Sequence, residues 1–328
     1  MMVNRKCLDV RGSRKKSLWN DIAFVSMTGL ILLLGPQAWG QTQAGDRRDP
    51  VPRIAIISAF EPELEKLRSK TEIKEVRLVN GRKHYIGKLE GHDVVLLLSG
   101  YSMVNAAMTT QALLDHFTVR EIVFSGIAGG VNPGLHVGDV TVPAEWGQYQ
   151  EQAFAREVPD GWDEGRQGKE FGNYGMMFPH SVSVVRSDGD PDKAERRFWF
   201  PADDHALAIA RTVASKVKLT RCLDKSVCLI TEPKVIVGGN GVSGPTFVDN
   251  AAYRQWVWQT FHADALDMET SAVTTVAYVN RVPFIAFRSL SDLAGGGGGK
   301  NEAAIFFKLA ADNSAEVVLA YLEADDRQ

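Results

Sequence analysis

Short apolar runs alternate with helix-like patterns along much of the chain. The runs at residues 54–57 and 94–98 are uninterrupted and bounded by turn-tolerant residues, which is typical of buried parallel strands. Between residues 104 and 116 the apolar positions recur with helical spacing, and residues 122–124 return to a strand-like pattern before an expected glycine-rich loop at 126–130. This order of strand, helix and strand predicts an α/β fold with parallel strands in its sheet.

The same alternation resumes in the second half of the chain. Helices are predicted over residues 205–217, 250–261 and 269–279. Strand-like runs stand at residues 227–230, 235–237, 265–268 and 284–287. The last run leads to Asp292 and five consecutive glycines at 295–299, and a closing helix is predicted to begin near Glu302.

Residues 146–204 break this rhythm because they are rich in charged, aromatic and turn-forming side chains. A long featureless loop is unusual in a compact domain, so we interpret this segment as an insertion that covers the sheet. Its aromatic side chains either wall a pocket or pack the insertion onto the core; the candidates are Trp146, Tyr149, Phe154, Trp162 and Phe171.

The first forty residues have the pattern of a signal peptide. Basic residues precede an apolar run of 13 residues from Ile22 to Leu34, followed by an Ala-x-Gly triplet that ends at Gly40. This run is shorter than the ~20 residues that a membrane-spanning helix needs. We predict a cleaved signal peptide over 1–40, a linker over 41–52, one domain over 53–328 and a periplasmic or secreted location. An uncleaved anchor is the alternative.

Composition and charge favour a small-molecule partner. With 45% hydrophobic and 23% charged residues, the 328-residue chain can bury one large core. The net charge of -3 provides no basic field for nucleic acid or an anionic membrane. Histidines are scattered singly, so no metal site and no cofactor are predicted.

Cysteine usage fits an oxidising compartment. Removal of the signal peptide would take Cys7 with it and leave Cys222 and Cys228, which predicts a local disulfide. Two reduced thiols are the alternative. The spacing differs from that of a CxxC redox pair or a zinc site.

Several chemically active groups stand at the ends of predicted strands. They are Glu63, the glycine-rich segment 126–130, Glu269 and Asp292. Ligands of doubly wound sheets bind where strands end, so these groups are expected on one rim. Partial burial of Asp292 would raise its pKa and make it a general acid. Each carboxylate also has a structural interpretation: a turn cap for Asp292, a helix-dipole partner for Glu269 and a solvated helix start for Glu63.

Four segments of the chain carry recognisable motifs: residues 51–64, 99–138, 241–250 and 265–295. The most specific motifs are SGIAGGVNPGLHVGD at 125–139, DMETSAV at 267–273 and RSLSDL at 288–293. Through these segments, most of the chain outside the insertion resembles the methylthioadenosine/adenosylhomocysteine nucleosidases and, more broadly, the purine nucleoside phosphorylase superfamily. Residues 243–250 are also similar to plant bark-storage and wound-inducible relatives. The resemblance implies a three-layer α/β sandwich, with helices flanking a mixed and partly closed central sheet, in a homo-oligomer.

The resemblance also implies residue roles in cleaving the N-glycosidic bond of a purine nucleoside, either methylthioadenosine-like or adenosine/inosine-like. Asp292 protonates N7 of the base, while Glu269 holds the ribose hydroxyls beside Met268. Phe247 stacks on the base, and Glu63 and Arg288 lie near the nucleophile. The matching segments also place Ala128, Gly129 and Ser291 in the substrate site.

The nucleophile is predicted to be water, so that free base is released. Phosphorylases of the superfamily hold phosphate with an Arg/Ser pair, where this chain has Phe124 and Ile127, and apolar side chains cannot form an anion site. Glu63 stands where nucleosidases have a water-activating glutamate. Two departures remain, because nucleosidases commonly have Ser at Ile127 and Glu at Asp267.

Three rival functions are open. A phosphate-dependent phosphorylase keeps the same fold, and a fold by itself does not exclude a non-catalytic nucleoside-binding or storage protein. The joint presence of Asp292, Glu269 and Glu63 argues against the latter. A dinucleotide-binding oxidoreductase is disfavoured because the glycines of segment 126–130 miss the GxGxxG spacing.

Overall fold

The computed structural model describes residues 48–327, apart from residues 166–168 and 298. The predicted signal peptide lies outside these residues, as does the linker up to residue 47. The end of the predicted linker belongs to the first strand, β1 (Asp49–Ser58), rather than to an irregular segment. Among the described residues, no helix combines the length and the apolar character needed to cross a membrane.

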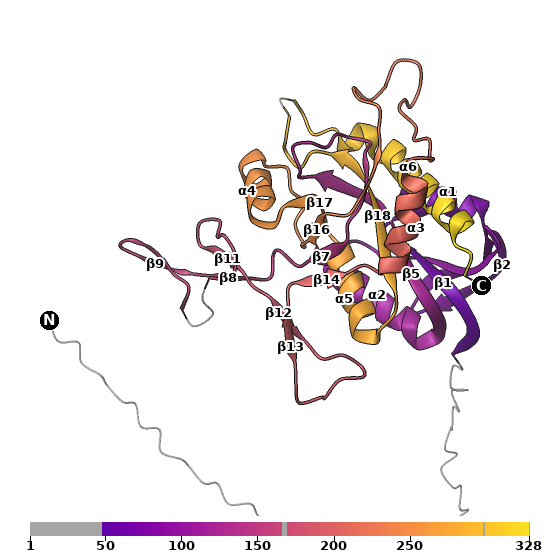
Figure 1. Ribbon diagram of the computed structural model, residues 1–328, viewed down its shortest axis with the longest axis horizontal. Helices are drawn as coiled ribbons and strands as arrows, with labels where there is room; N and C mark the ends of the chain where they lie inside the picture. The colour runs from indigo at the N-terminus through magenta and orange to yellow at the C-terminus, as the bar shows by residue number, and fades with distance from the viewer. Residues whose placement is uncertain (1–47, 166–168, 298, 328) are drawn as a thin grey trace, which may run out of the picture. The chain divides into compact units, whose positions relative to one another are not determined.

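A mixed sheet of 12 strands forms the centre of the domain (Figure 1). Strand β1 runs parallel to both of its neighbours, β4 (His92–Leu98) and β5 (Phe117–Gly130). On the other side of β5, β18 (Phe284–Asp292) is also parallel, whereas β17 (Ala263–Asp267) pairs antiparallel with the last residues of β5. Strand β5 is therefore the branch point of the sheet.

The remaining strands extend the sheet from these neighbours. Beyond β17 lie β16 (Asn240–Ser243), β7 (Glu145–Gly147) and β14 (Trp199–Pro201). Beyond β4 lie β3 (Arg82–Leu89) and β2 (Glu72–Val79). Beyond β18 lie β6 (Val140–Val142) and β15 (Val235–Val237).

Helices cover both faces of the sheet, which is why residues 54–57 of β1 and 94–97 of β4 are apolar and fully buried. Successive side chains of a strand point to opposite faces. Ile54 and Ile56 of β1 pack in one core with α1 (Glu61–Lys70), α3 (Asp204–Ala214) and α6 (Ala303–Ala324). Ala55 and Ile57 pack in another core with α2 (Ser102–His116) and α5 (Thr270–Asn280). The predicted three-layer α/β sandwich with a mixed sheet is confirmed.

Three local predictions were wrong. The glycine-rich segment 126–130 continues strand β5 instead of forming a loop. Its glycines permit close packing, because a Cβ at Gly126 would lie 2.1 Å from Nη1 of Arg288. The last strand continues past residue 287 to Asp292, since residues 288–290 and 292 still pair with β5. Residues 227–230 form no extended strand and lie at the end of a loop that the disulfide between Cys222 and Cys228 closes.

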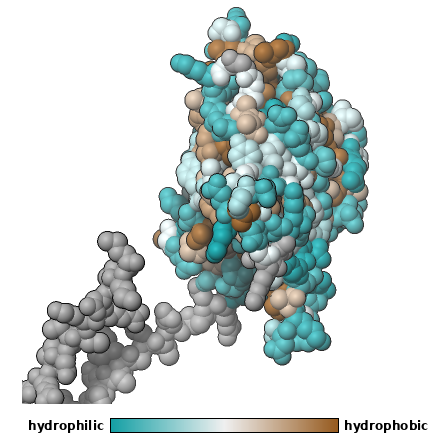
Figure 2. Space-filling model, turned by 90° about the vertical axis from the view of Figure 1, so that its left-hand side faces the viewer, coloured by the Kyte–Doolittle hydropathy of each residue, from teal (hydrophilic) through white to brown (hydrophobic). Residues whose placement is uncertain are grey.

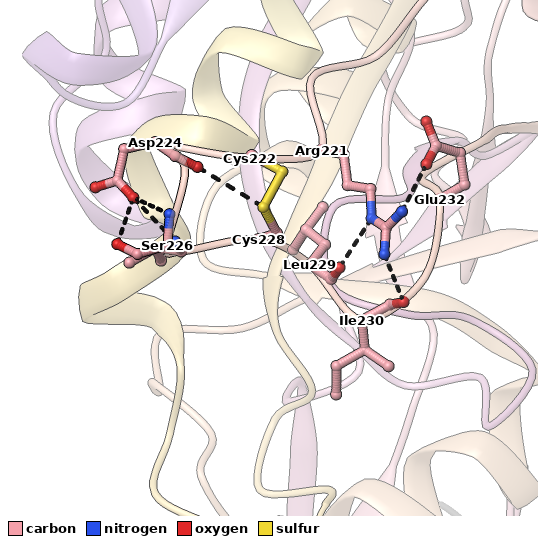
Figure 3. The surroundings of a disulfide bond; sticks show 9 residues. Arg221, Cys222, Asp224, Ser226, Cys228, Leu229, Ile230 and Glu232 are labelled. Atoms are coloured by element: carbon pink, nitrogen blue, oxygen red, sulfur yellow. Dashed lines mark hydrogen bonds and ion pairs between the residues drawn. A yellow bond between two sulfur atoms is a disulfide. The ribbon is translucent and has the colours of Figure 1, made fainter.

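Side-chain bonds organise this loop, and the predicted disulfide between Cys222 and Cys228 is confirmed (Figure 3). The Arg221 guanidinium donates to the carbonyls of Leu229 and Ile230. These side-chain hydrogen bonds satisfy backbone carbonyls that the neighbouring strand of a sheet would otherwise have paired.

The predicted insertion consists of short antiparallel pairs that project from the sheet (Figure 1). They are β8 (Gln152–Phe154) with β11 (Met177–Pro179), β9 (Arg156–Val158) with β10 (Gly161–Asp163), and β12 (Val182–Val184) with β13 (Glu195–Arg197). The two ends of the segment, β7 and β14, pair with each other inside the main sheet. This end of the molecule is mostly hydrophilic, with hydrophobic side chains in separate patches (Figure 2).

Three of the five aromatic residues named for the insertion pack into the core rather than wall a pocket. Trp146 and Tyr149 are fully buried. The Phe171 ring lies 4.3 Å from that of Phe198 and 5.3 Å from that of Phe261 at the end of α4 (Ala251–Phe261). Phe154 and Trp162 are exposed.

Candidate active site

A cavity of about 190 Å³ lies at the carboxyl ends of the central strands. It is lined by residues that end or follow β1, β4, β5, β16, β17 and β18. These are Ala59, Phe60, Glu63, Tyr101, Ile127, Ala128, Gly129, Thr246, Phe247, Val248, Leu266, Asp267, Met268, Glu269, Ser291 and Asp292. Every predicted catalytic and substrate-binding residue except Arg288 lines this cavity.

Asp292 ends strand β18 and is 3% exposed. Its Oδ1 accepts a hydrogen bond from the backbone N–H of Ala294 at 2.8 Å, and its Oδ2 accepts one from the Ser291 hydroxyl at 2.9 Å. Burial raises the pKa of this carboxyl, which those hydrogen bonds partly oppose and the nearby Asp249 carboxylate reinforces. A carboxyl that keeps its proton to higher pH can act as a proton donor to a ligand in the cavity.

Glu63 lies in the first turn of α1, where β1 has just ended, and is 2% exposed. Its Oε2 accepts from the backbone N–H of Ala59 at 2.7 Å and its Oε1 from that of Ile127 at 2.8 Å. Burial raises the pKa of Glu63, and the nearby Arg288 guanidinium partly offsets this. The two N–H groups hold the Glu63 carboxylate in one orientation at the cavity wall.

Arg288 lies beneath the cavity with its side chain fully buried. Its Nη2 is 2.7 Å from Oδ2 of Asp267 and 3.7 Å from Oε2 of Glu269, and its Nη1 is 3.5 Å from Oε1 of Glu63. Its guanidinium carbon lies 4.1 Å from the centre of the Phe124 ring. The single guanidinium group of Arg288 therefore forms ion pairs with three carboxylates and holds them together at the base of the cavity.

Glu269 stands immediately before α5 and combines burial with like-charge neighbours. Burial and the adjacent Asp267 carboxylate raise the pKa of Glu269 to about 7. Its Oε1 accepts a hydrogen bond of 2.7 Å from the backbone N–H of Ser102. This carboxylate faces the cavity and can accept hydrogen bonds from ligand hydroxyl groups.

Two aromatic residues of the cavity wall escaped sequence analysis. Phe60 and Tyr101 stack with ring centroids 5.3 Å apart, and they follow β1 and β4 directly. Their position after buried strands could have indicated a place in the site. An aromatic side chain at such a position, however, does not by itself indicate ligand binding or catalysis. Phe247 lies at the cavity mouth and is 61% exposed, which leaves its ring free to cover a planar ligand.

No cluster of His, Cys, Asp and Glu that could hold a metal ion occurs among the described residues. The arrangement can instead perform acid–base chemistry, with a proton donor in one part of the cavity and a group of carboxylates in another. A three-layer α/β sandwich with such a site at the strand ends is the architecture of an enzyme that acts on a small organic molecule.

The family model of the phosphorylase superfamily matches residues 53–323, and the chain belongs to this superfamily. A 5′-methylthioadenosine/S-adenosylhomocysteine nucleosidase from Bacillus cereus (strain G9842) is 31% identical over 248 residues, covering 74% of this chain and 87% of the relative.

Solved structures show the same fold. A 5′-methylthioadenosine/S-adenosylhomocysteine nucleosidase from Colwellia psychrerythraea, in complex with adenine, is 26% identical with a TM-score of 0.62, and the match covers 84% of this chain and 97% of that one. The futalosine hydrolase of Helicobacter pylori is 20% identical with a TM-score of 0.62, covering 83% and 98%.

Proposed function

We propose that the protein hydrolyses the N-glycosidic bond of a purine nucleoside and releases the free base. The observation that carries this proposal is the presence in one cavity of a buried acid, Asp292, and a group of carboxylates, Glu63, Asp267 and Glu269. The names of the relatives, which are nucleosidases and a hydrolase, support the same reaction.

Glu63 and Asp292 divide the proton transfers. Water attacks the anomeric carbon and gives a proton to the Glu63 carboxylate. The C–N bond breaks, its electron pair goes to the base, and Asp292 delivers a proton to N7 of the purine. Both groups have a pKa raised by burial, which brings each closer to the pH at which it works.

The sugar becomes positively charged as the bond breaks. Three carboxylates against one guanidinium leave a surplus of negative charge beside the cavity. Glu269 accepts hydrogen bonds from the ribose hydroxyls, and Met268 lies beside it. These contacts strengthen in the transition state, which is the condition for an increase in rate.

Water is the nucleophile in this proposal because phosphate has no suitable place. The side chains of Phe124 and Ile127 are apolar, and Phe124 lies against the face of the Arg288 guanidinium. Arg288 is already engaged by carboxylates, so a phosphate anion there would meet net repulsion. The N–H of Ile127 is also occupied, since it donates to Glu63.

The test is release of free base from adenosine, inosine and methylthioadenosine, each with and without phosphate. Equal release without phosphate is expected. Release that requires phosphate would identify a phosphorylase, and tight nucleoside binding without cleavage would identify a binding protein. The same panel ranks the base and the 5′ substituent that the cavity prefers.

We further propose that the protein is exported. The signal-peptide pattern of residues 1–40 and the disulfide of Cys222 with Cys228 both support this location, since structural disulfides persist in oxidising compartments. Fractionation of cells that produce the full-length chain, with mass determination of the mature N-terminus, tests export and cleavage near Gly40.

We also propose a homo-oligomer. Tyr101, Val104 and Met108 follow helical spacing at the start of α2 and are 59%, 79% and 51% exposed. An apolar stripe of this kind beside a cavity favours burial against another protein surface. Analytical ultracentrifugation of the mature chain gives the assembly state, and a monomer at micromolar concentration would contradict the proposal.

A further inference from the structure

The side chain of Asn301 lies between two carboxylates next to the cavity. Its Nδ2 donates to Oδ1 of Asp249 at 3.0 Å and to Oδ1 of Asp292 at 3.5 Å. Its Oδ1 accepts from the backbone N–H of Ala303, the first residue of α6, at 2.8 Å. Because its oxygen is engaged by that donor, the NH2 end of the amide faces the two acids.

The segments joined by Asn301 are also in close backbone contact. The N–H of Asn250, which precedes α4, donates to the carbonyl of Ala294 at 3.1 Å. Gly295 adopts φ +89°, and a Cβ there would lie 2.2 Å from the Asn250 nitrogen. Asn301 therefore links the end of β18, the segment before α4 and the start of α6 at a place with little room for adjustment.

The two oxygens of Asp292 have unequal surroundings. Oδ1 accepts from two N–H donors, those of Ala294 and Asn301. Among the residues that the structure describes, the sole donor to Oδ2 is the Ser291 hydroxyl, which also lies 3.4 Å from the Ala128 carbonyl and can donate there instead. Two N–H donors stabilise the unprotonated oxygen, so a proton on this carboxyl is favoured on Oδ2.

We propose that Asn301 is a positioning residue that holds Asp292 with its transferable proton on Oδ2. This inference rests on the proposed function. Asn301 acts through Asp292 and Asp249. Its loss therefore impairs the departure of a base that must be protonated, and it leaves the attack on the sugar intact.

The test compares leaving groups. Wild type, Asn301→Ala and Asn301→Asp are assayed on the best purine nucleoside and on 4-nitrophenyl β-D-ribofuranoside, whose phenolate leaves without a proton. Asn301→Asp keeps an oxygen for the Ala303 N–H but loses the NH2 group. Asn173→Ala is the matched control, because it removes an amide donor to the Gly175 carbonyl in the insertion.

Both Asn301 variants are expected to lower kcat on the nucleoside at least about 10-fold, a part of the 10²–10⁴-fold typical of general acid catalysis, with little change in KM. Cleavage of the nitrophenyl riboside should change less than about two-fold, since that step needs no acid. The control should match wild type on both substrates.

Equal losses on both substrates would show a merely structural role and overturn the inference, as would unchanged kcat on the nucleoside. Far-ultraviolet circular dichroism and the melting temperature distinguish a folded variant from a misfolded one. A wild-type protein that releases no base overturns the proposed function itself, whereas active wild type with unaffected variants overturns only the role of Asn301.

Discussion

A cluster of buried charged side chains lies at each end of strand β5, and the two clusters differ in their balance of positive and negative groups. At the carboxyl end, Asp267, Glu63 and Glu269 surround the single guanidinium of Arg288 beside the cavity. Near the amino end, two carboxylates meet two arginines. The first cluster has an excess of negative charge, and the second is balanced.

The balanced cluster ties the C-terminal residues to the sheet. Glu121 of β5 accepts from the Tyr321 hydroxyl at 2.7 Å and from Nη2 of Arg327 at 2.9 Å. Asp325 pairs with Nε of Arg327 at 2.6 Å and lies 3.6 Å from Nη2 of Arg120. Each buried carboxylate has its own cationic partner, and Tyr321 is fully buried in the core.

The difference separates a structural role from a functional one. Buried ions cost free energy unless they are paired and hydrogen-bonded, so a balanced cluster needs no ligand to explain it. Surplus negative charge at a cavity costs stability, and a cationic sugar in the transition state would offset that cost.

The largest expected effect comes from the acid at the functional end. Asp292→Asn should reduce kcat on purine nucleosides by about 10²–10⁴-fold while nucleoside binding is largely kept, because the amide cannot donate its proton to the base. Steady-state kinetics and binding calorimetry measure the two quantities. Wild-type turnover in this variant would remove Asp292 from the acid role.

A matched pair of substitutions tests whether the two clusters differ in kind. Glu63→Gln should lower hydrolysis about 10²-fold because water loses its base. Glu121→Gln should leave turnover unchanged and lower the free energy of unfolding by about 1–3 kcal/mol through a weakened buried network. Kinetics and urea denaturation of both variants are compared. The distinction fails if the two variants lose activity equally.

The surplus charge should also appear in the pH dependence of stability. The pKa of Glu269 rises from its ordinary 4.5 to about 7 on folding, so its contribution is fully present below the lower value and is lost as pH rises through about 7. Glu269→Gln should remove this slope and gain on the order of 3 kcal/mol at alkaline pH.

Urea denaturation across this pH range measures the change, with Glu72→Gln on the exposed edge strand β2 as the control. Parallel pH profiles of wild type and Glu269→Gln would contradict the raised pKa. A residual slope is expected, because burial raises the pKa of Glu63 and Asp292 in the same direction.

The substitution with the smallest expected effect changes only the balanced cluster. Tyr321→Phe removes the hydrogen bond donated to Glu121 and the one accepted from Nη2 of Arg327, and it keeps the packing of the ring, so it should cost about 1–2 kcal/mol of unfolding free energy. Turnover should equal that of wild type. A fall in kcat would mean that the two ends of β5 are coupled.

The chemically active groups could be located from the sequence because each stands at or beyond the end of a predicted strand. Glu63, Glu269 and Asp292 were placed in this way, and the structure brings all three to one cavity. The prediction of a loop at residues 126–130 was wrong, because glycine is typical both of turns and of close packing. Close packing applies here because of Arg288, which is distant in the sequence and lies against Gly126.

The layered fold, the local disulfide and the three carboxylates are predictable from the sequence, because periodicity, cysteine count and local motifs act over short stretches of chain. The surroundings of those groups arise only on folding. The tertiary structure placed Arg288 beneath the site against Phe124, brought Asn301 to Asp292, and set the surplus of negative charge. Burial and electrostatic coupling depend on residues that are distant along the chain, and their distances exist only once it has folded.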